Sequence, residues 1–220
     1  MSGRIATPVL VAGLGRFGSA LAATLMRLGH DVLAVDGDAR IVQQYAAEFT
    51  HTVEVDSTNP YALRQLGVAD LEVAVVGIGA DMEASILTVA ALADLGVPNI
   101  WAKATTRAHG RILSRVGAHH VVLPEHQMGE RVAHILSGRM IDFIQLDEGF
   151  ALVETTVPTE MVDRSLTDSQ VRARWGITVV CIKPVGGSFT YATADTVPRA
   201  GDTLVVAGKT AYVQKFAERA

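Results

Sequence analysis

Residues 9–21 read Val9-Leu10-Val11-Ala12-Gly13-Leu14-Gly15-Arg16-Phe17-Gly18-Ser19-Ala20-Leu21. An apolar strand pattern runs into three glycines and straight on into a helical pattern. In such a segment Gly13 permits a tight turn, Gly15 lets the backbone approach a phosphate, and Gly18 lets the helix pack against the strand. The free N–H groups and the positive dipole end of the helix then face an anion, so this stretch predicts a nucleotide-binding site.

An acidic residue follows where a dinucleotide-binding unit places one on the ribose hydroxyls. A second apolar run, residues 32–35, ends at Asp36, 18 positions after Gly18. Taken alone, Asp36 also reads as a turn acid before Gly37-Asp38. Strand, glycines, helix, strand and acid occur together here, however, and this context favours the nucleotide interpretation.

The composition sets outer limits on the class of protein. The 220 residues are 49% hydrophobic and 19% charged, which is typical of a globular chain, and no apolar run reaches the roughly 18 residues of a membrane helix. We expect a soluble protein without a secretory or transit segment. The formal charge of −4 and the lack of a Lys/Arg cluster argue against a nucleic-acid partner. The lone Cys181 predicts a buried strand residue in a reducing, cytoplasmic setting.

Short apolar runs alternate with helical patterns through the first part of the chain. This rhythm predicts an α/β fold, a Rossmann-like doubly wound parallel sheet, over residues 1–125. A crossover helix and linker is expected over 126–146, and a second, smaller α+β domain over 147–220. The expected strands are 8–12, 32–35, 52–55, 73–77, 99–103, 120–123, 151–157, 177–183, 189–191 and 204–207, with helices near 168–174 and 210–218 in the second domain.

Polar residues follow several of these strands, where doubly wound sheets bind ligands. They are Asp36-Gly37-Asp38, Asp56-Ser57, Ile78-Gly79-Ala80, Lys103-Ala104-Thr105 and Pro124-Glu125. Arg16 and Lys103 are suited to phosphates, whereas Glu125 would repel them unless a cation such as Mg²⁺ or Ca²⁺ lies between. Each residue alone reads equally well as a turn residue or a solvated surface charge.

The helical pattern over 82–95 carries no charge between Ala84 and Ala93. A surface helix normally shows a polar stripe, so something must cover both faces of this one. We expect the cover to be another subunit, with the chain's own second domain as the alternative.

Taken in order, several motifs resemble the RCK family, whose members regulate potassium conductance, and in particular its KtrA- and TrkA-like cytosolic gating subunits. The matching stretches are Gly13-Leu14-Gly15-Arg16-Phe17-Gly18, Asp36, Ile78-Gly79-Ala80, Asn99-Ile100-Trp101-Ala102-Lys103-Ala104, Gly117-Ala118 with Pro124-Glu125, and Gly201-Asp202-Thr203-Leu204-Val205-Val206-Ala207-Gly208. The resemblance covers nearly the whole chain. It implies a non-enzymatic regulator, a homo-octameric ring of subunits, and a membrane-embedded KtrB- or TrkH-like potassium channel subunit as partner.

The resemblance also implies ligands and their residues. ATP and ADP would compete for the N-terminal domain, with Arg16 at the γ-phosphate, Asp36 on the ribose, and Glu125 sharing Mg²⁺ or another cation with the γ-phosphate across a dimer interface. The implied nucleotide-binding residues are Gly13, Gly15, Arg16, Phe17, Gly18, Asp36, Gly37, Asp38, Asp56, Ser57, Ile78, Gly79, Ala80, Lys103, Ala104, Thr105, His109 and Glu125. Some members bind cyclic di-AMP between C-terminal domains, at positions matching Val171, Arg172, Ile182 and Pro184; an ordinary dimer core explains these four equally well.

Alternatives to an ATP-responsive regulator remain open at this point. Asp38 and Asp56 stand where KtrA-like chains carry neutral amides, which leaves the base and cofactor preference undecided. The glycine fingerprint suits an NAD(P)-dependent oxidoreductase or an NAD(H)-responsive member of the same family, although no proton relay is recognisable. A zinc site built from the histidines at 109, 119, 120, 126 and 134 is a weaker alternative, since no cysteine accompanies them.

Overall fold

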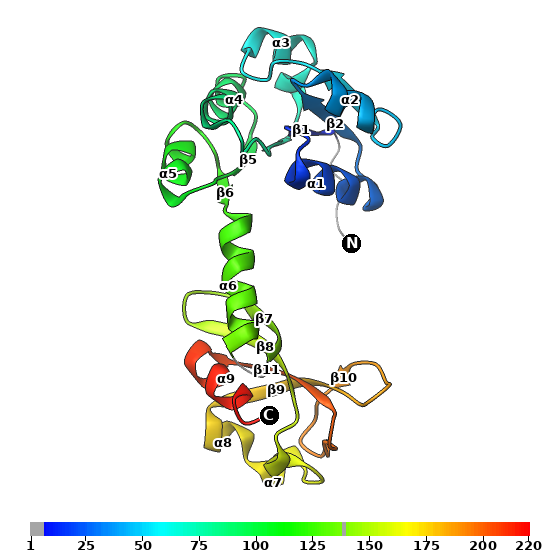
Figure 1. The fold of residues 1–220 in the computed structure, drawn as a ribbon, viewed down its shortest axis with the longest axis vertical. Helices are drawn as coiled ribbons and strands as arrows, with labels where there is room; N and C mark the ends of the chain where they lie inside the picture. The colour runs from blue at the N-terminus through cyan, green and yellow to red at the C-terminus, as the bar shows by residue number, and fades with distance from the viewer. Residues whose placement is uncertain (1–6, 138–139) are drawn as a thin grey trace. The chain divides into compact units, whose positions relative to one another are not determined.

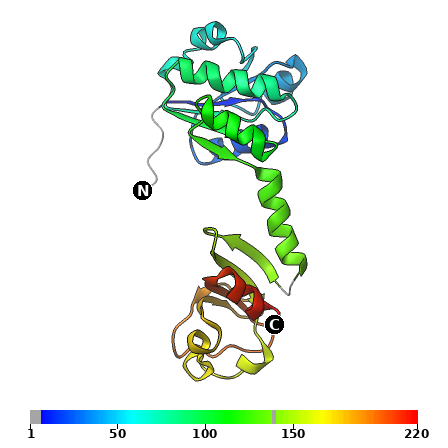
Figure 2. The same cartoon turned by 90° about the vertical axis from the view of Figure 1, so that its left-hand side faces the viewer.

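The computed structural model describes residues 7–137 and 140–220. The chain divides into two compact units, Met1–Glu125 and His126–Ala220, whose elements can be followed in Figure 1 and Figure 2. Positions 138–139 of the expected linker lie outside the described residues.

The first unit is built on a six-stranded parallel sheet in the order β3-β2-β1-β4-β5-β6. This is the doubly wound order, and it confirms the predicted Rossmann-like fold. The strands are β1 (Val9–Ala12), β2 (Val32–Asp36), β3 (His51–Glu54), β4 (Val73–Val76), β5 (Asn99–Lys103) and β6 (His120–Val122). The helices are α1 (Arg16–Arg27), α2 (Ala39–Tyr45), α3 (Pro60–Gln65), α4 (Met82–Asp94) and α5 (Arg107–Arg115), with a 3-10 turn η1 (Val68–Asp70).

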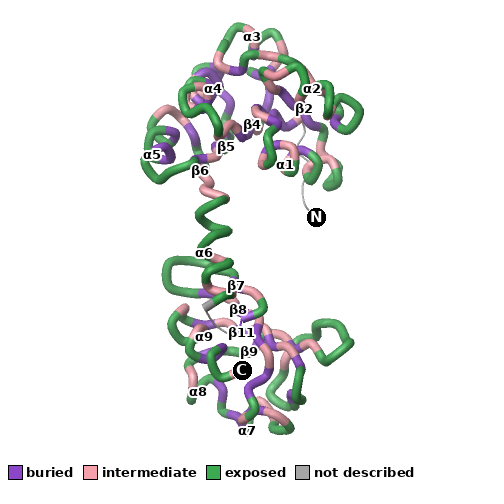
Figure 3. Tube along the Cα trace, in the orientation of Figure 1, coloured by how far each residue is buried: buried purple, intermediate pink, exposed green. Residues whose placement is uncertain are grey.

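The central strands are apolar throughout because both faces of the sheet are covered. All four residues of β1 are buried, and so are the first four of β2. Leu10, Val76 and Ile100 are fully buried in the larger core of this unit, which appears as the purple centre of the first unit in Figure 3. Continuous hydrophobic runs of this kind are expected where helices cover both faces of a parallel sheet.

Helix α4 owes its apolar character mainly to its own unit. It packs on β4 and β5 and contacts α3 on one side and α5 on the other. Ser85, Thr88 and Leu92 are completely buried there. The sequence pattern predicts that another subunit, or the second domain of the chain, covers this helix. In the structure the first domain itself buries most of it. Met82 and Leu87 stay 45% exposed.

The second unit is an antiparallel sheet in the order β10-β9-β11-β8-β7, with helices packed on it, which confirms the predicted smaller α+β domain. Its strands are β7 (Met140–Gln145), β8 (Phe150–Thr156), β9 (Ile177–Lys183), β10 (Thr190–Tyr191) and β11 (Thr203–Lys209). The helices are α6 (Pro124–Ser137), which begins in the first unit, α7 (Leu166–Ser169), α8 (Val171–Trp175) and α9 (Thr210–Ala217), with a 3-10 turn η2 (Thr159–Met161).

Two local expectations for the second unit were wrong. The helix expected over 168–174 is broken into α7 and α8 because Gln170 between them is left-handed, with φ of 48°. Cys181, expected to be buried, is half-buried on β9.

No helix within residues 7–137 and 140–220 combines the length and apolar character needed to cross a membrane.

Candidate functional site

A hollow of about 680 Å³ opens at the carboxyl ends of the strands in the first unit. Its lining residues follow β1, β2, β3 and β4. The strand order reverses between β1 and β4, and such a reversal is the general ligand position of doubly wound sheets. The N–H of Gly13 donates to the carbonyl of Val35 at 2.8 Å, and the N–H of Gly77 donates to that of Ala12 at 2.7 Å. These bonds hold the glycine-rich loops against the ends of the sheet.

The three fingerprint glycines differ in backbone angle and in the space around them. Gly13 has φ of 89°, and a Cβ on it would lie 2.8 Å from the Ile78 side chain. A Cβ on Gly18 would lie 1.9 Å from the carbonyl oxygen of Gly13. A Cβ on Gly15, the residue before α1, would have no atom of the described chain within 4 Å apart from Gly15 and its two neighbours in sequence. The backbone there faces open space at a helix N-terminus, which suits an anion.

Asp36 ties the glycine loop to the end of β2. One carboxylate oxygen accepts the N–H of Leu14 at 2.7 Å, and the other accepts the N–H of Asp38 at 2.9 Å. A carboxylate oxygen can accept more than one hydrogen bond, so this group can hold the loop and also accept ribose hydroxyls.

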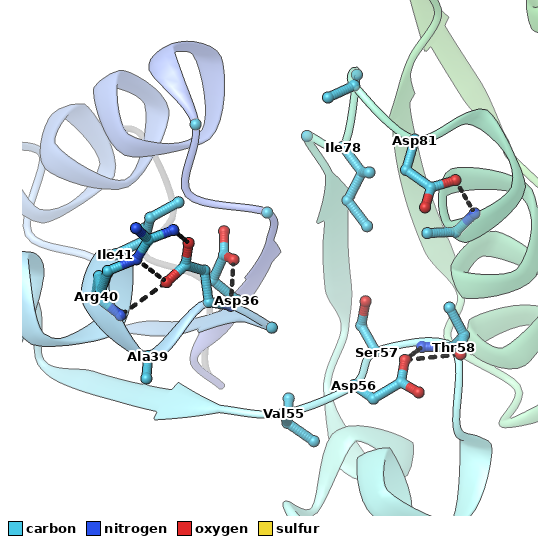
Figure 4. Close-up of a pocket in the computed structure, with 18 residues that line it drawn as sticks. Asp36, Ala39, Arg40, Ile41, Val55, Asp56, Ser57, Thr58, Ile78 and Asp81 are labelled. Atoms are coloured by element: carbon cyan, nitrogen blue, oxygen red, sulfur yellow. Dashed lines mark hydrogen bonds and ion pairs between the residues drawn. The ribbon is translucent and has the colours of Figure 1, made fainter.

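Further acidic groups surround the hollow, and each is held by hydrogen bonds. Asp38 accepts from the backbone and guanidinium of Arg40, which lowers the pKa of this carboxyl to about 2. The hydroxyl and backbone N–H of Thr58 lower the pKa of Asp56. Asp81 caps α4 by accepting from the N–H of Ala84. In Figure 4 the residues of the β2–α2 segment face Ile78 and Asp81 across the hollow.

Ten of the residues expected to bind nucleotide line this hollow: Gly13, Gly15, Asp36, Gly37, Asp38, Asp56, Ser57, Ile78, Gly79 and Ala80. It is also lined by residues that the sequence analysis did not single out, namely Ala39, Arg40, Ile41, Val55, Thr58, Gly77, Asp81 and Ala84. Most of these immediately follow an expected strand or an expected site residue. Their position next to those residues in the sequence could have identified them.

The other expected residues lie outside that lining. They are Arg16, Phe17, Gly18, Lys103, Ala104, Thr105, His109 and Glu125. Gly18 and Ala104 are buried structural positions.

Lys103 connects several of these residues with the hollow. Its ammonium lies 2.6 Å from the Glu125 carboxylate and 5.9 Å from the centre of the Phe17 ring. A Cβ on Gly79, which lines the hollow, would lie 3.2 Å from the Lys103 Nζ. The Lys103 hydrogen bond lowers the pKa of Glu125, and the positive charge of Arg16 contributes in the same direction. Two cations and one carboxylate therefore lie close together beside Gly79 at the edge of the hollow.

Known proteins similar in sequence identify the family to which this chain belongs. The family model described as "TrkA-N domain" matches residues 9–124. This chain belongs to the TrkA-N domain family. It is 36% identical to Ktr system potassium uptake protein A of Bacillus subtilis (strain 168), over 94% of this chain and 93% of the relative. It is 37% identical to Ktr system potassium uptake protein C of the same organism, over 95% of each chain.

Solved structures show the same fold as this TrkA-N chain. The GsuK RCK domain matches with a TM-score of 0.68 at 19% identity, covering 99% of this chain and 48% of that one. The GsuK channel bound to NAD matches with a TM-score of 0.67 at 18% identity, covering 99% of this chain and 40% of that one. Together with the relatives, these matches confirm the resemblance to the RCK family.

The second unit of this TrkA-N chain has a hollow of its own, of about 570 Å³, between α8, β9 and the segment after β10. Val171 and Arg172, two of the positions matched to cyclic di-AMP binding, line it. Ile182 is buried in the core of the second unit, and Pro184 does not line this hollow.

The histidines do not assemble into a zinc site in the part of the chain that the structure describes, where no group of three or more His, Cys, Asp or Glu could hold a metal ion. His119 is instead engaged through its Nδ1, which accepts the N–H of Ile100 at 3.0 Å. His109 is 1% exposed and lies in the first unit beneath Thr105.

His109 predicts a pH dependence of stability for this TrkA-N chain. Burial lowers its pKa below the ordinary value of 6.5, and among the described residues its Nε2 finds no hydrogen-bond partner. Below pH 6.5 the unfolded chain binds a proton that the folded chain resists, so stability should fall as the pH falls from 6.5 toward the lowered folded pKa. In urea unfolding, the free energy of unfolding of the parent protein should be lower at pH 5 than at pH 7. This loss should be smaller in His109→Gln. An equal loss in both proteins would contradict this role.

Proposed function

We propose that this chain is a non-enzymatic regulatory subunit of a potassium uptake system and that adenine nucleotides bound at the glycine-rich hollow control it. One observation carries the proposal. Gly13, Gly15 and the Asp36 carboxylate line one hollow at the ends of the parallel strands, in a chain over a third identical to two Ktr potassium uptake proteins along nearly its whole length. Regulation of potassium transport is the function that these relatives support.

The nucleotide would be oriented by charge. Its phosphates would lie over Gly15, where N–H groups of the α1 N-terminus are unpaired within the helix. Its ribose would rest on Asp36, and its base would extend toward Asp56 and Ile41 at the other end of the hollow. In this arrangement the phosphates would lie at the N-terminus of α1, and the carboxylates of Asp38 and Asp56 would face the nucleoside.

A third phosphate would meet the cations outside the hollow. Arg16 is exposed on the first turn of α1, and Lys103 lies beside Gly79. The Lys103 ammonium is paired with Glu125, so a γ-phosphate would compete with that carboxylate for it. A ligand that makes contacts in one state and not in another shifts the balance between them, and here the γ-phosphate would make that difference between ATP and ADP.

The proposed cation at Glu125 fits only when a phosphate is present. In the chain itself one carboxylate faces Lys103 and the charge of Arg16, a surrounding that repels a metal ion. A triphosphate would neutralise these cations and add oxygen ligands, and Mg²⁺ is commonly held by one or two carboxylates plus phosphate oxygens. Glu125 would then hold Mg²⁺ or another cation together with the γ-phosphate.

The remaining parts of the proposal concern assembly and location. We propose a homo-octamer at the cytoplasmic face of the membrane, docked on a membrane-embedded potassium channel subunit of the KtrB or TrkH kind. NAD(H) is a second candidate ligand, since the GsuK channel has been solved with NAD bound and Asp36 suits an unmodified ribose. Cyclic di-AMP is a further candidate at the second unit.

Arg16 tests the discrimination between ATP and ADP. Arg16→Ala should weaken ATP binding about tenfold and leave ADP binding nearly unchanged, because a bidentate contact to the γ-phosphate is lost. Calorimetry with both nucleotides measures the ratio. Arg27→Ala, on the last turn of the same helix, is the matched control and should leave the ratio as it is. An unchanged ATP-to-ADP ratio in Arg16→Ala would refute the γ-phosphate role.

The variant Glu125→Gln tests whether a cation binds at this carboxylate. In the parent protein, adding Mg²⁺ should strengthen ATP binding, and EDTA should reverse the effect. Glu125→Gln should remove this dependence, because an amide oxygen is a weaker cation ligand than a carboxylate oxygen. Glu130→Gln, five residues along α6 and paired with His126, is the control. Should Glu125→Gln keep the full Mg²⁺ dependence, the cation would have to lie elsewhere.

A further inference from the structure

A third hollow, of about 550 Å³, lies between the end of α8 and α9. It belongs to the second unit and shares no residue with the nucleotide hollow. Its lining is Ala173, Arg174, Trp175, Gly176, Tyr212, Lys215, Phe216 and Arg219. Three of these residues are cations and none is an acid, although the whole chain has a formal charge of −4. This basic hollow therefore stands out from the rest of the molecule.

The cations of the basic hollow exceed the acidic groups available to them. Arg174 and Arg219 both reach the same carboxylate, Glu160, at 2.8 Å and 3.4 Å. Lys215 has no ion pair in the part of the chain that the structure describes. Among the described residues, these three positive charges have one carboxylate within ion-pair distance, which leaves an excess of two. Such an excess in a concave site attracts anions of matching charge.

Aromatic rings give the basic hollow fixed walls. The Arg174 guanidinium lies 4.4 Å from the centre of the Trp175 ring, and Trp175 meets the buried Phe216 edge-on at 5.3 Å. Gly176 has φ of 67°, and a Cβ on it would lie 2.8 Å from the Tyr212 ring. The close approach of Tyr212 thus depends on glycine at this position. A site whose walls are set by ring contacts needs little reorganisation on binding.

We propose that the basic hollow binds a small polyvalent anion, a molecule with at least two phosphate or carboxylate groups. Its volume falls within the range of small-molecule pockets. The arginine forks match the paired oxygens of either group, and Lys215 supplies a further point charge. A molecule with two negative charges balances the excess, which favours it over singly charged ions.

The test uses the full chain and the tryptophan inside the site. The sequence has two tryptophans, so Trp101→Phe leaves Trp175 as the sole reporter. Titration with inorganic diphosphate and, separately, with citrate at constant ionic strength should change the Trp175 fluorescence in a saturable way. A response to either anion supports the site and identifies the preferred group.

Variants decide whether the response comes from the basic hollow. Lys215→Gln should weaken binding at least tenfold, whereas Lys183→Gln, a cation near Phe189 in the same unit, should leave it unchanged. Gly15→Ala should also leave it unchanged, which separates this site from the nucleotide hollow. Absence of a saturable response, equal affinity in Lys215→Gln, or binding of an acidic peptide but of neither small anion would overturn the proposal.

Discussion

Gly15→Ala is expected to weaken ATP and ADP binding at least tenfold, about 1.4 kcal/mol, while the chain stays folded. The reason is the empty space in front of this residue. Beyond Gly15 and its sequence neighbours, no atom of the described residues lies within 4 Å of a Cβ at Gly15, so an alanine side chain fits there without a clash. The methyl group would instead occupy the space where a phosphate must approach the N–H groups of α1. Function and stability should therefore separate at this position.

Calorimetry and urea unfolding together measure this separation. Alanine is a poorer helix N-cap than glycine, so a stability loss of up to about 1 kcal/mol is expected. Gly129→Ala is the control, because a Cβ at Gly129 also meets nothing within 4 Å but lies on α6, far along the chain from the cradle. It should leave binding unchanged. Nucleotide binding as tight in Gly15→Ala as in the parent would mean that the phosphates do not lie on this loop.

Gly18→Ala is expected to have the opposite profile, a large loss of stability. Its Cβ would lie 1.9 Å from the carbonyl oxygen of Gly13, which is backbone and cannot rotate away. Gly77 also packs closely against this turn, since a Cβ on Gly77 would lie 3.3 Å from the Gly18 Cα. Helix α1 would have to move off the sheet, and overpacking of this kind typically costs 1–3 kcal/mol or more. We expect Gly18→Ala to lower the free energy of unfolding by about 3 kcal/mol.

Urea unfolding of Gly18→Ala, followed by circular dichroism, measures this loss. The first unit should unfold at a clearly lower urea concentration than in the parent, and nucleotide binding should weaken with it. A variant as stable as the parent would show that α1 and the end of β1 are less closely packed than the structure shows.

The strand and helix pattern was readable from sequence because the first unit follows simple periodicities. Each expected strand of this unit lies within about one residue of an observed one, and Gly13, Gly15 and Gly18 identified the turn from β1 into α1. These features are local: a run of buried side chains or a turn that needs glycine leaves its mark on adjacent residues.

What the sequence did not reveal depends on contacts between distant segments or on single backbone angles. The pairing of Lys103 with Glu125 needs β5 and the start of α6 to meet at one edge of the sheet. The break in the helix expected over 168–174 depends on one left-handed residue, Gln170, which is not a glycine. Helix α4 is apolar because α3 and α5 flank it, which only the folded unit shows.

Calorimetric titration of the purified full chain with ATP, ADP, NAD⁺ and NADH, each with and without Mg²⁺, tests the central claim most directly. The account predicts binding of both ATP and ADP, with only ATP strengthened by Mg²⁺. Binding confined to NAD⁺ or NADH would contradict an ATP- and ADP-responsive regulator and would favour an NAD(H)-responsive protein built on the same fold.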